Sequence, residues 1–70
     1  MNLGRTIRAQ LEFLGMSVLD LCRESGLASG TVHRVLRGED CYVSTLETIA
    51  DTLGIQLSDL IAWSEEDEEE

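Results

Sequence analysis

Two arginines and a histidine lie close together in the segment "VHRVLRGED". His33, Arg34 and Arg37 can all donate hydrogen bonds, and an arginine guanidinium can form two parallel bonds with a phosphate or with the edge of a guanine. The segment ends on Glu39 and Asp40, in a chain whose net charge is −9. These residue types predict binding of a phosphate-like anion or of a nucleic-acid base, and the two neighbouring acids weaken the attraction to an anion.

Other kinds of chemistry have few candidate residues in this chain. There is one histidine, and Cys22 and Cys41 do not form a C-x-x-C pair, so we expect no metal site. No acid and base are paired in a plausible pocket, and no glycine loop resembles a phosphate cradle, so we expect neither an enzyme nor a cofactor. The two thiols could join in a disulfide, but no signal peptide is evident, and reduced thiols in a cytoplasmic protein are favoured. Cys22 is interpreted as a buried structural thiol, and Cys41 as a loop residue open to oxidation.

The acidic charge is concentrated at the C-terminus. The segment "SEEDEEE", residues 64–70, holds six of the fourteen acids, which leaves five arginines against eight acids in the rest of the chain. We therefore predict a folded domain over residues 1–63 and a disordered acidic tail over residues 64–70. The tail either only aids solubility or docks on the arginines and competes with an anionic partner. No apolar run is long enough to cross a membrane.

Apolar residues recur at intervals of three and four along the chain, which is the helical period. Proline is absent, and no alternating stretch predicts a strand. We expect an all-α fold, a compact bundle of five short helices around one core. The expected helices cover residues 3–14, 18–25 and 29–37, a segment that opens at Ser44 and ends at Gly54, and residues 57–63.

Capping signals delimit several of these helices. "SVLD", residues 17–20, fits a capping box in which the Ser17 hydroxyl accepts from a first-turn amide and Asp20 accepts from the Ser17 amide. "STLE", residues 44–47, is interpreted as a second box. The glycines that follow the helical segments supply the left-handed residue that often ends a helix.

The segments "SVLDLCRES" and "SGTVHRVLR" are two short helices joined through "GLA", the sequence form of a helix-turn-helix. One face of the second helix is apolar and the opposite face is open to contacts. The apolar face consists of Val32, Val35 and Leu36; the other carries Gly30, His33, Arg34 and Arg37. The arginines could be ordinary solubilising residues, but their place on the presented face favours contact with DNA.

Residues 3–63 resemble the lambda-repressor-like helix-turn-helix domains of the Cro/repressor or Xre type. That family carries S-x-x-x-L-A-x-x-x-G-[VI]-S-x-x-T-[IV]-x-x-[ILW]-x-x-G, and later a helix close to SLETLxxIAxALGVSLxEL. The second half is matched by "STLETIADTLGIQLSDL". The first half is matched by Ser17, Leu21, Cys22 in place of a small alanine, Gly26, Leu27, Thr31, Val32, Val35 and Gly38. The resemblance implies a DNA-binding transcriptional regulator, a small bacterial or phage repressor that binds double-stranded DNA as a homodimer on a palindromic operator.

The resemblance also implies roles for individual residues. Base-reading positions are occupied by Ser29, Gly30 and Arg34, with His33 beside them. DNA-backbone positions are occupied by Ser17 and Arg37, and the first helix adds Arg5 and Arg8, which lie one turn apart. An interface between two copies is expected along the last helix, at Leu57, Leu60, Ile61 and Trp63; Trp63 has a competing interpretation as a contact within one domain.

This chain departs from the family pattern at three places. Ala28 stands where relatives have a capping Ser or Thr, so either Ser29 caps a shortened helix or the cap is lost. Gly30 offers no side chain to a base, and Glu39 with Asp40 stand where relatives often carry basic residues. Glu39, Asp40 and the acidic tail favour a second hypothesis, a protein-interaction module (an antirepressor, an antitoxin-like partner or a DNA mimic) that uses its acidic surface.

Overall fold

The computed structural model describes residues 2–39 and 42–66, and this part of the chain forms helices and turns without strands. It confirms the all-α fold. The five helices are α1 (Leu3–Leu14), α2 (Val18–Ser25), α3 (Ser29–Leu36), α4 (Val43–Leu53) and α5 (Leu57–Glu66). Within them, α2 has the predicted bounds, and α1 ends at Gly15 as expected.

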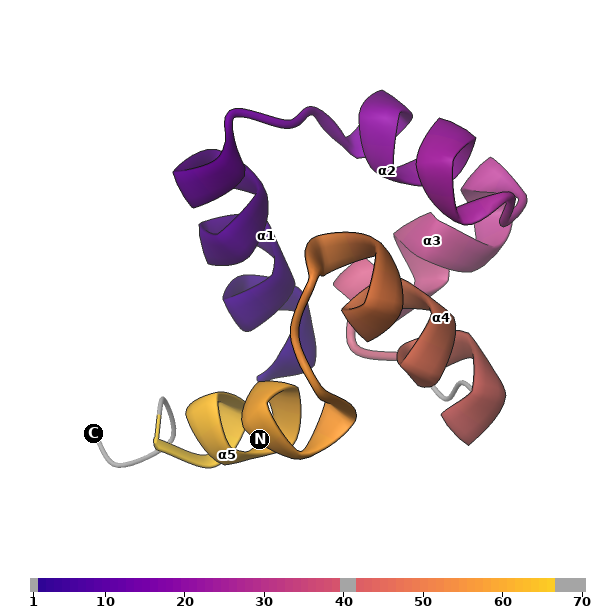
Figure 1. Ribbon diagram of the computed structural model, residues 1–70. Helices are drawn as coiled ribbons and strands as arrows, with labels where there is room; N and C mark the ends of the chain where they lie inside the picture. The colour runs from indigo at the N-terminus through magenta and orange to yellow at the C-terminus, as the bar shows by residue number, and fades with distance from the viewer. Residues whose placement is uncertain (1, 40–41, 67–70) are drawn as a thin grey trace.

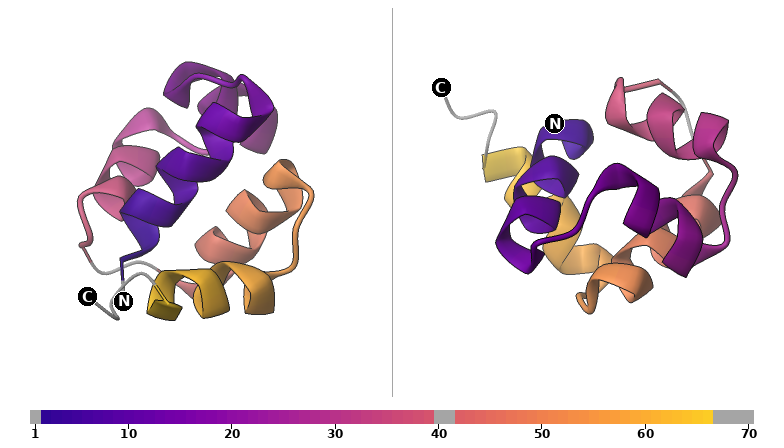
Figure 2. Two further views of the ribbon diagram at one scale, coloured as in Figure 1. Left: turned by 90° about the vertical axis from the view of Figure 1, so that its left-hand side faces the viewer. Right: turned by 90° about the horizontal axis from the view of Figure 1, so that it is seen from above.

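The helices pack in pairs that form a closed ring, from α1 to α3, α2, α4, α5 and back to α1. In Figure 1, α2 and α3 lie together on one side, α1 lies on the other, and α5 crosses the base. The views in Figure 2 keep the start of α1 beside α5. The Asn2 amide donates to the Ser64 carbonyl oxygen across this junction at 3.4 Å. The ring arrangement therefore depends on contacts between the two ends of the domain.

One hydrophobic core fills the ring. Its members come from all five helices and include the residues predicted to form the apolar face of α3. The buried apolar side chains are Ile7, Leu11, Leu21, Val32, Val35, Leu36, Leu46, Ile49, Ala50, Leu53 and Leu60. Cys22 is a free thiol, partly buried and packed against this cluster, whereas Cys41 lies outside the described residues. Leu14 follows Ile7 and Leu11 at helical spacing, but it is the last residue of α1 and is 44% exposed.

The capping box at the start of α2 is confirmed. The Asp20 amide donates to Ser17 Oγ at 3.0 Å, and the Ser17 amide donates to Asp20 Oδ2 at 3.0 Å. The second predicted box is wrong, because α4 begins at Val43 and places Ser44 inside its first turn. The amides of Thr45 and Leu46 already donate to the carbonyl oxygen of Tyr42, and no side chain caps this end.

The capping box should make stability sensitive to acid. The Ser17 amide, followed by the Ser17 hydroxyl, holds the pKa of Asp20 below its ordinary value of 3.8. A carboxylate with a lowered folded pKa stabilises the fold above the unfolded value and loses that effect as pH falls through the folded value. Asp20→Asn should therefore lower Tm at neutral pH, and the Tm difference from wild type should shrink below about pH 4. Thermal melts from pH 7 to pH 2 measure it.

The matched control is Ser17→Ala, which removes the hydroxyl without removing a titrating group. It should cost about 1 kcal/mol of unfolding free energy at neutral pH. A constant Tm difference between Asp20→Asn and wild type throughout the acid range would contradict the assigned role of the carboxylate.

Helix α5 extends beyond the boundary predicted at Trp63. It continues to Glu66, and Ser64 is fully buried against α1. Ser64 Oγ lies 3.1 Å from Thr6 Oγ1 and 2.8 Å from the Leu60 carbonyl oxygen. Residues 64–66 thus belong to the helical domain, and the predicted tail is too long by these three residues. Its remainder, residues 67–70, lies outside the described residues.

Two truncations should separate the domain from the tail. A chain ending at Glu66 should keep the unfolding free energy of the full chain, because it retains every described contact of α5. A chain ending at Trp63 loses the buried Ser64 hydroxyl and the last turn of the helix, and should lose about 1–2 kcal/mol. Urea unfolding followed by circular dichroism measures both. Equal stability of the two truncated chains would place the domain boundary back at Trp63.

Candidate nucleic-acid interface

Helix α3 has one buried face and one exposed face, as the sequence predicts. Val32, Val35 and Leu36 are buried in the core. Ser29, Gly30, His33, Arg34 and Arg37 are all exposed. The helix therefore presents five neighbouring positions that were predicted to meet DNA, held by a rigid apolar contact on the other side.

The start of α3 lacks a side-chain cap. Ala28 occupies the N-cap position without a side-chain hydrogen bond, so the helix is not shortened to place Ser29 there. The amides of Thr31 and Val32 donate to the Ala28 carbonyl oxygen. Nothing lies within 4 Å of the position that a Cβ would occupy at Gly30. This end of α3 is small and open, which allows its backbone to approach a partner closely.

The two arginines of α3 differ in their surroundings. Among the described residues, Arg34 has no ion-pair partner, whereas Arg37 Nε donates to Glu39 Oε2 at 3.1 Å. Gly38, with φ of +82°, turns the chain between Arg37 and Glu39 and ends the helix as predicted. Asp40, the second local acid, lies outside the described residues. Arg34 is thus the cation on α3 that is available to a ligand without first breaking a contact.

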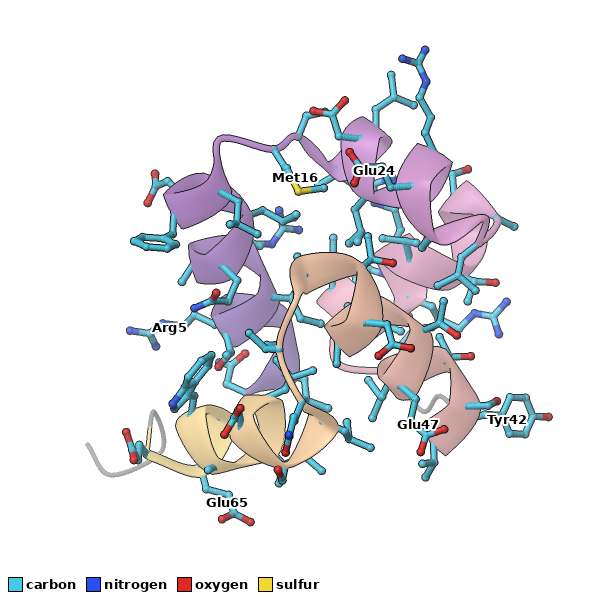
Figure 3. All side chains as sticks on the ribbon, in the orientation of Figure 1. Arg5, Met16, Glu24, Tyr42, Glu47 and Glu65 are labelled. Atoms are coloured by element: carbon cyan, nitrogen blue, oxygen red, sulfur yellow. The ribbon has the colours of Figure 1, made fainter. Side chains whose placement is uncertain are left out.

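The predicted backbone-contacting residues fall into separate groups. Arg8 and Ser17 line one open groove between α1 and the start of α2, together with Glu12. Arg5 lines another groove, between α1 and α5, with Trp63 and Glu66. In Figure 3, Arg5 points away from α3, on the outer side of α1. The structure therefore brings Arg8 to Ser17 but does not bring Arg5 to the exposed face of α3.

The predicted interface along α5 needs one correction. Leu60 is fully buried, so it stabilises the domain itself, whereas Leu57 packs against the core and is only partly buried. A side chain without exposed surface cannot contact a second chain. Ile61 is partly buried and Trp63 is 37% exposed at the rim of the α1–α5 groove. Leu57, like Ile61, keeps part of its side chain exposed, so of the four predicted residues only Leu60 is excluded.

Two structural features were not predicted from the sequence, the packing of Gly4 and the exposure of Tyr42. Gly4 in α1 packs directly against α3, since an added Cβ would overlap the Leu36 carbonyl group. Tyr42 is 81% exposed and points outward from the start of α4 in Figure 3. The sequence does not show which element a single glycine early in a helix packs against. The sequence shows that an aromatic residue precedes the helix, but whether its side chain is exposed depends on where α4 begins.

An all-α ring in which α2 and α3 pack together and α3 presents one polar face is a helix-turn-helix domain. The sequence matches the Cro/C1-type HTH DNA-binding domains over residues 6–66, and the chain belongs to this family. A search of curated proteins and a search of solved structures each gave no match. The resemblance inferred from the sequence motifs is thus confirmed at the level of the family.

Two further properties of the described residues bear on function. No helix there has the length and apolar composition needed to cross a bilayer. No three His, Cys, Asp or Glu side chains in these residues come together as metal ligands would.

Proposed function

We propose that the chain is a sequence-specific transcriptional regulator that binds double-stranded DNA, a small bacterial or phage repressor without catalytic activity. The observation that carries this proposal is the exposed face of α3, with Arg34 outside any described ion pair, on the scaffold of a DNA-binding family. The proposal requires no cofactor, and it places the protein in the cytoplasm, with the DNA.

In the proposed mechanism α3 enters the major groove. Its N-terminal residues and Arg34 face the base edges, and Arg37 faces the sugar–phosphate backbone. Arg8 and Ser17 contact a neighbouring phosphate in this mechanism, which is supported by the groove that they share at the start of α2. Bound at an operator, the protein blocks polymerase by occupying the site.

We further propose that two copies bind together on a palindromic operator, with half-sites about one helical turn, ~34 Å, apart. The exposed part of Trp63, next to the partly buried Ile61, supports an interface along α5. Large aromatic side chains are enriched at such interfaces because they bury much surface at a small cost in conformational entropy.

Selection of bound fragments from random and genomic duplex DNA tests the function. The intact chain should enrich one palindromic sequence at about 50 mM salt, where even weak phosphate contacts retain DNA. The chain ending at Glu66, run in parallel, shows whether the acidic tail opposes binding. Failure of both chains to retain any duplex at this salt concentration would rule out the proposal.

A second candidate function is favoured by one observation, the pairing of Arg37 with Glu39. A scaffold that neutralises its own backbone-contacting arginine and carries an acidic surface suits a protein-interaction module, such as an antirepressor, an antitoxin-like partner or a DNA mimic. Such a module should ignore random duplex at about 50 mM salt, whereas a repressor should bind it weakly.

A further inference from the structure

The C-terminal end of α3 carries the ion pair between Arg37 and Glu39. Arg37 Nε and Glu39 Oε2 are 3.1 Å apart, and the two side chains remain 60% and 51% exposed. The pair therefore lies in water at the edge of the candidate interface. It combines one positive and one negative charge at the point where DNA backbone contact is proposed.

Backbone hydrogen bonds at the end of α3 hold Glu39 close to Arg37. Gly38 adopts a left-handed conformation, its amide donates to the Val35 carbonyl oxygen at 3.0 Å, and the Glu39 amide donates to the Arg34 carbonyl oxygen at 3.0 Å. These two bonds form the glycine-ended helix terminus known as a Schellman motif. Because Glu39 is held by its own amide, its carboxylate stays within reach of Arg37 without ordering a flexible loop.

Pairing with Glu39 changes what Arg37 can contribute to DNA binding. An arginine that neutralises a phosphate releases a counterion from the duplex, and this release drives binding at low salt. An arginine beside a carboxylate has already lost much of its positive potential, and the carboxylate repels the same phosphate. In water such an exposed pair is weak, so a phosphate can displace the carboxylate, but at a cost to affinity.

We propose that Glu39 is an internal competitor for Arg37, which lowers the affinity of the domain for every duplex alike. This inference rests on the proposed function of DNA binding. Phosphate contacts carry no sequence information, so Glu39 suppresses binding to random DNA without acting on the contacts to base edges. The affinities for operator and for random duplex are therefore both lowered, while the ratio between them stays the same.

The test replaces Glu39 by glutamine, which keeps the size of the side chain and removes its charge. Binding is measured by fluorescence anisotropy on the selected operator and on a random duplex, from about 50 to 200 mM salt. Glu39→Gln should bind both duplexes about 2- to 5-fold more tightly, and the plot of log K against log salt should steepen by up to ~0.9. Glu65→Gln, the same change at an exposed site on α5, should leave both quantities nearly unchanged.

A double-mutant cycle with Arg37→Ala identifies the route of the effect. If Glu39 acts mainly by occupying Arg37, then Glu39→Gln should lose most of its gain in the Arg37→Ala background, and the small remainder should come from relief of the direct repulsion between the carboxylate and the phosphate. The inference is overturned if Glu39→Gln binds as wild type does, or if its full gain persists without Arg37. If neither wild type nor Glu39→Gln binds any duplex, the proposed function is wrong, and this inference, which depends on it, is wrong as well. Matching thermal melts of the variants confirm that folding is intact.

Discussion

Replacing Gly4 by alanine is expected to destabilise the domain by about 2–3 kcal/mol, because the added methyl group overlaps backbone that cannot move aside. The Cβ would meet the carbonyl group of Leu36, near the end of α3. A flexible side chain could rotate away, but a helix carbonyl can yield only if α1 and α3 separate. Separation would also disturb the core, because Ile7 of α1 belongs to the same buried cluster as the apolar face of α3.

The measurement is thermal unfolding, in which a loss of this size should lower Tm by roughly 10–20 °C in a domain of this length. Gly30→Ala is the matched control, since its Cβ meets open space and its backbone is helical. That substitution should raise the unfolding free energy by about 0.5–1 kcal/mol through the lower chain entropy of alanine. Equal Tm values for the two variants would show that the close approach of α1 to α3 is not a constraint.

The close approach matters for function because it helps to fix the orientation of α3. The apolar face of α3 packs into the core, and Gly4 lets α1 press against its last turn. Gly4→Ala should therefore also weaken DNA binding at temperatures where the domain is still folded, because the exposed residues of α3 lose their common orientation.

The sequence predicted most accurately what is decided locally. The capping box at Ser17 and the bounds of α2 depend on residues within a few positions of one another, and these predictions are confirmed. The predicted box at Ser44 is wrong because the helix begins from an equally local alternative, the backbone of Tyr42, which is the N-cap two residues earlier. Side-chain capping is one of several ways to satisfy the first amides of a helix, and the sequence pattern does not rank them.

What could not be predicted depends on residues far apart in the chain. In the sequence, Ser64 is the first residue of an acidic run. In the structure, it is buried against Thr6, which comes from the opposite end of the chain. Similarly, Leu60 and Trp63 lie on the same short helix, and only the packing of α1 against α5 decides that one is core and the other is exposed. At the candidate interface, the sequence shows an acid at residue 39. Its contact with Arg37 depends on the turn at Gly38, which is known only from the structure.

Replacing Arg34 by alanine is expected to remove most of the preference for the operator over random duplex, a loss of about 5- to 150-fold in the affinity ratio. Arg34 is the α3 cation outside any described ion pair, on the exposed face between the open N-terminal end and Arg37. A guanidinium aligned with the O6 and N7 atoms of guanine donates two bonds, and no other base presents the same pair of acceptors there.

Arg34→Lys separates this geometry from simple charge. Lysine keeps the positive charge and the attraction to phosphate, but it lacks the planar fork that bonds to guanine at two points. Binding of Arg34→Lys to random duplex should thus stay close to wild type, while its operator preference falls most of the way to that of Arg34→Ala. Arg37→Ala should instead weaken operator and random duplex equally, because phosphate contacts are the same on both. Two outcomes would contradict this role. Either Arg34→Lys would keep the full operator preference, or Arg34→Ala and Arg37→Ala would lower both affinities equally. In either case Arg34 would act only through its charge, and another residue of α3 would have to read the bases.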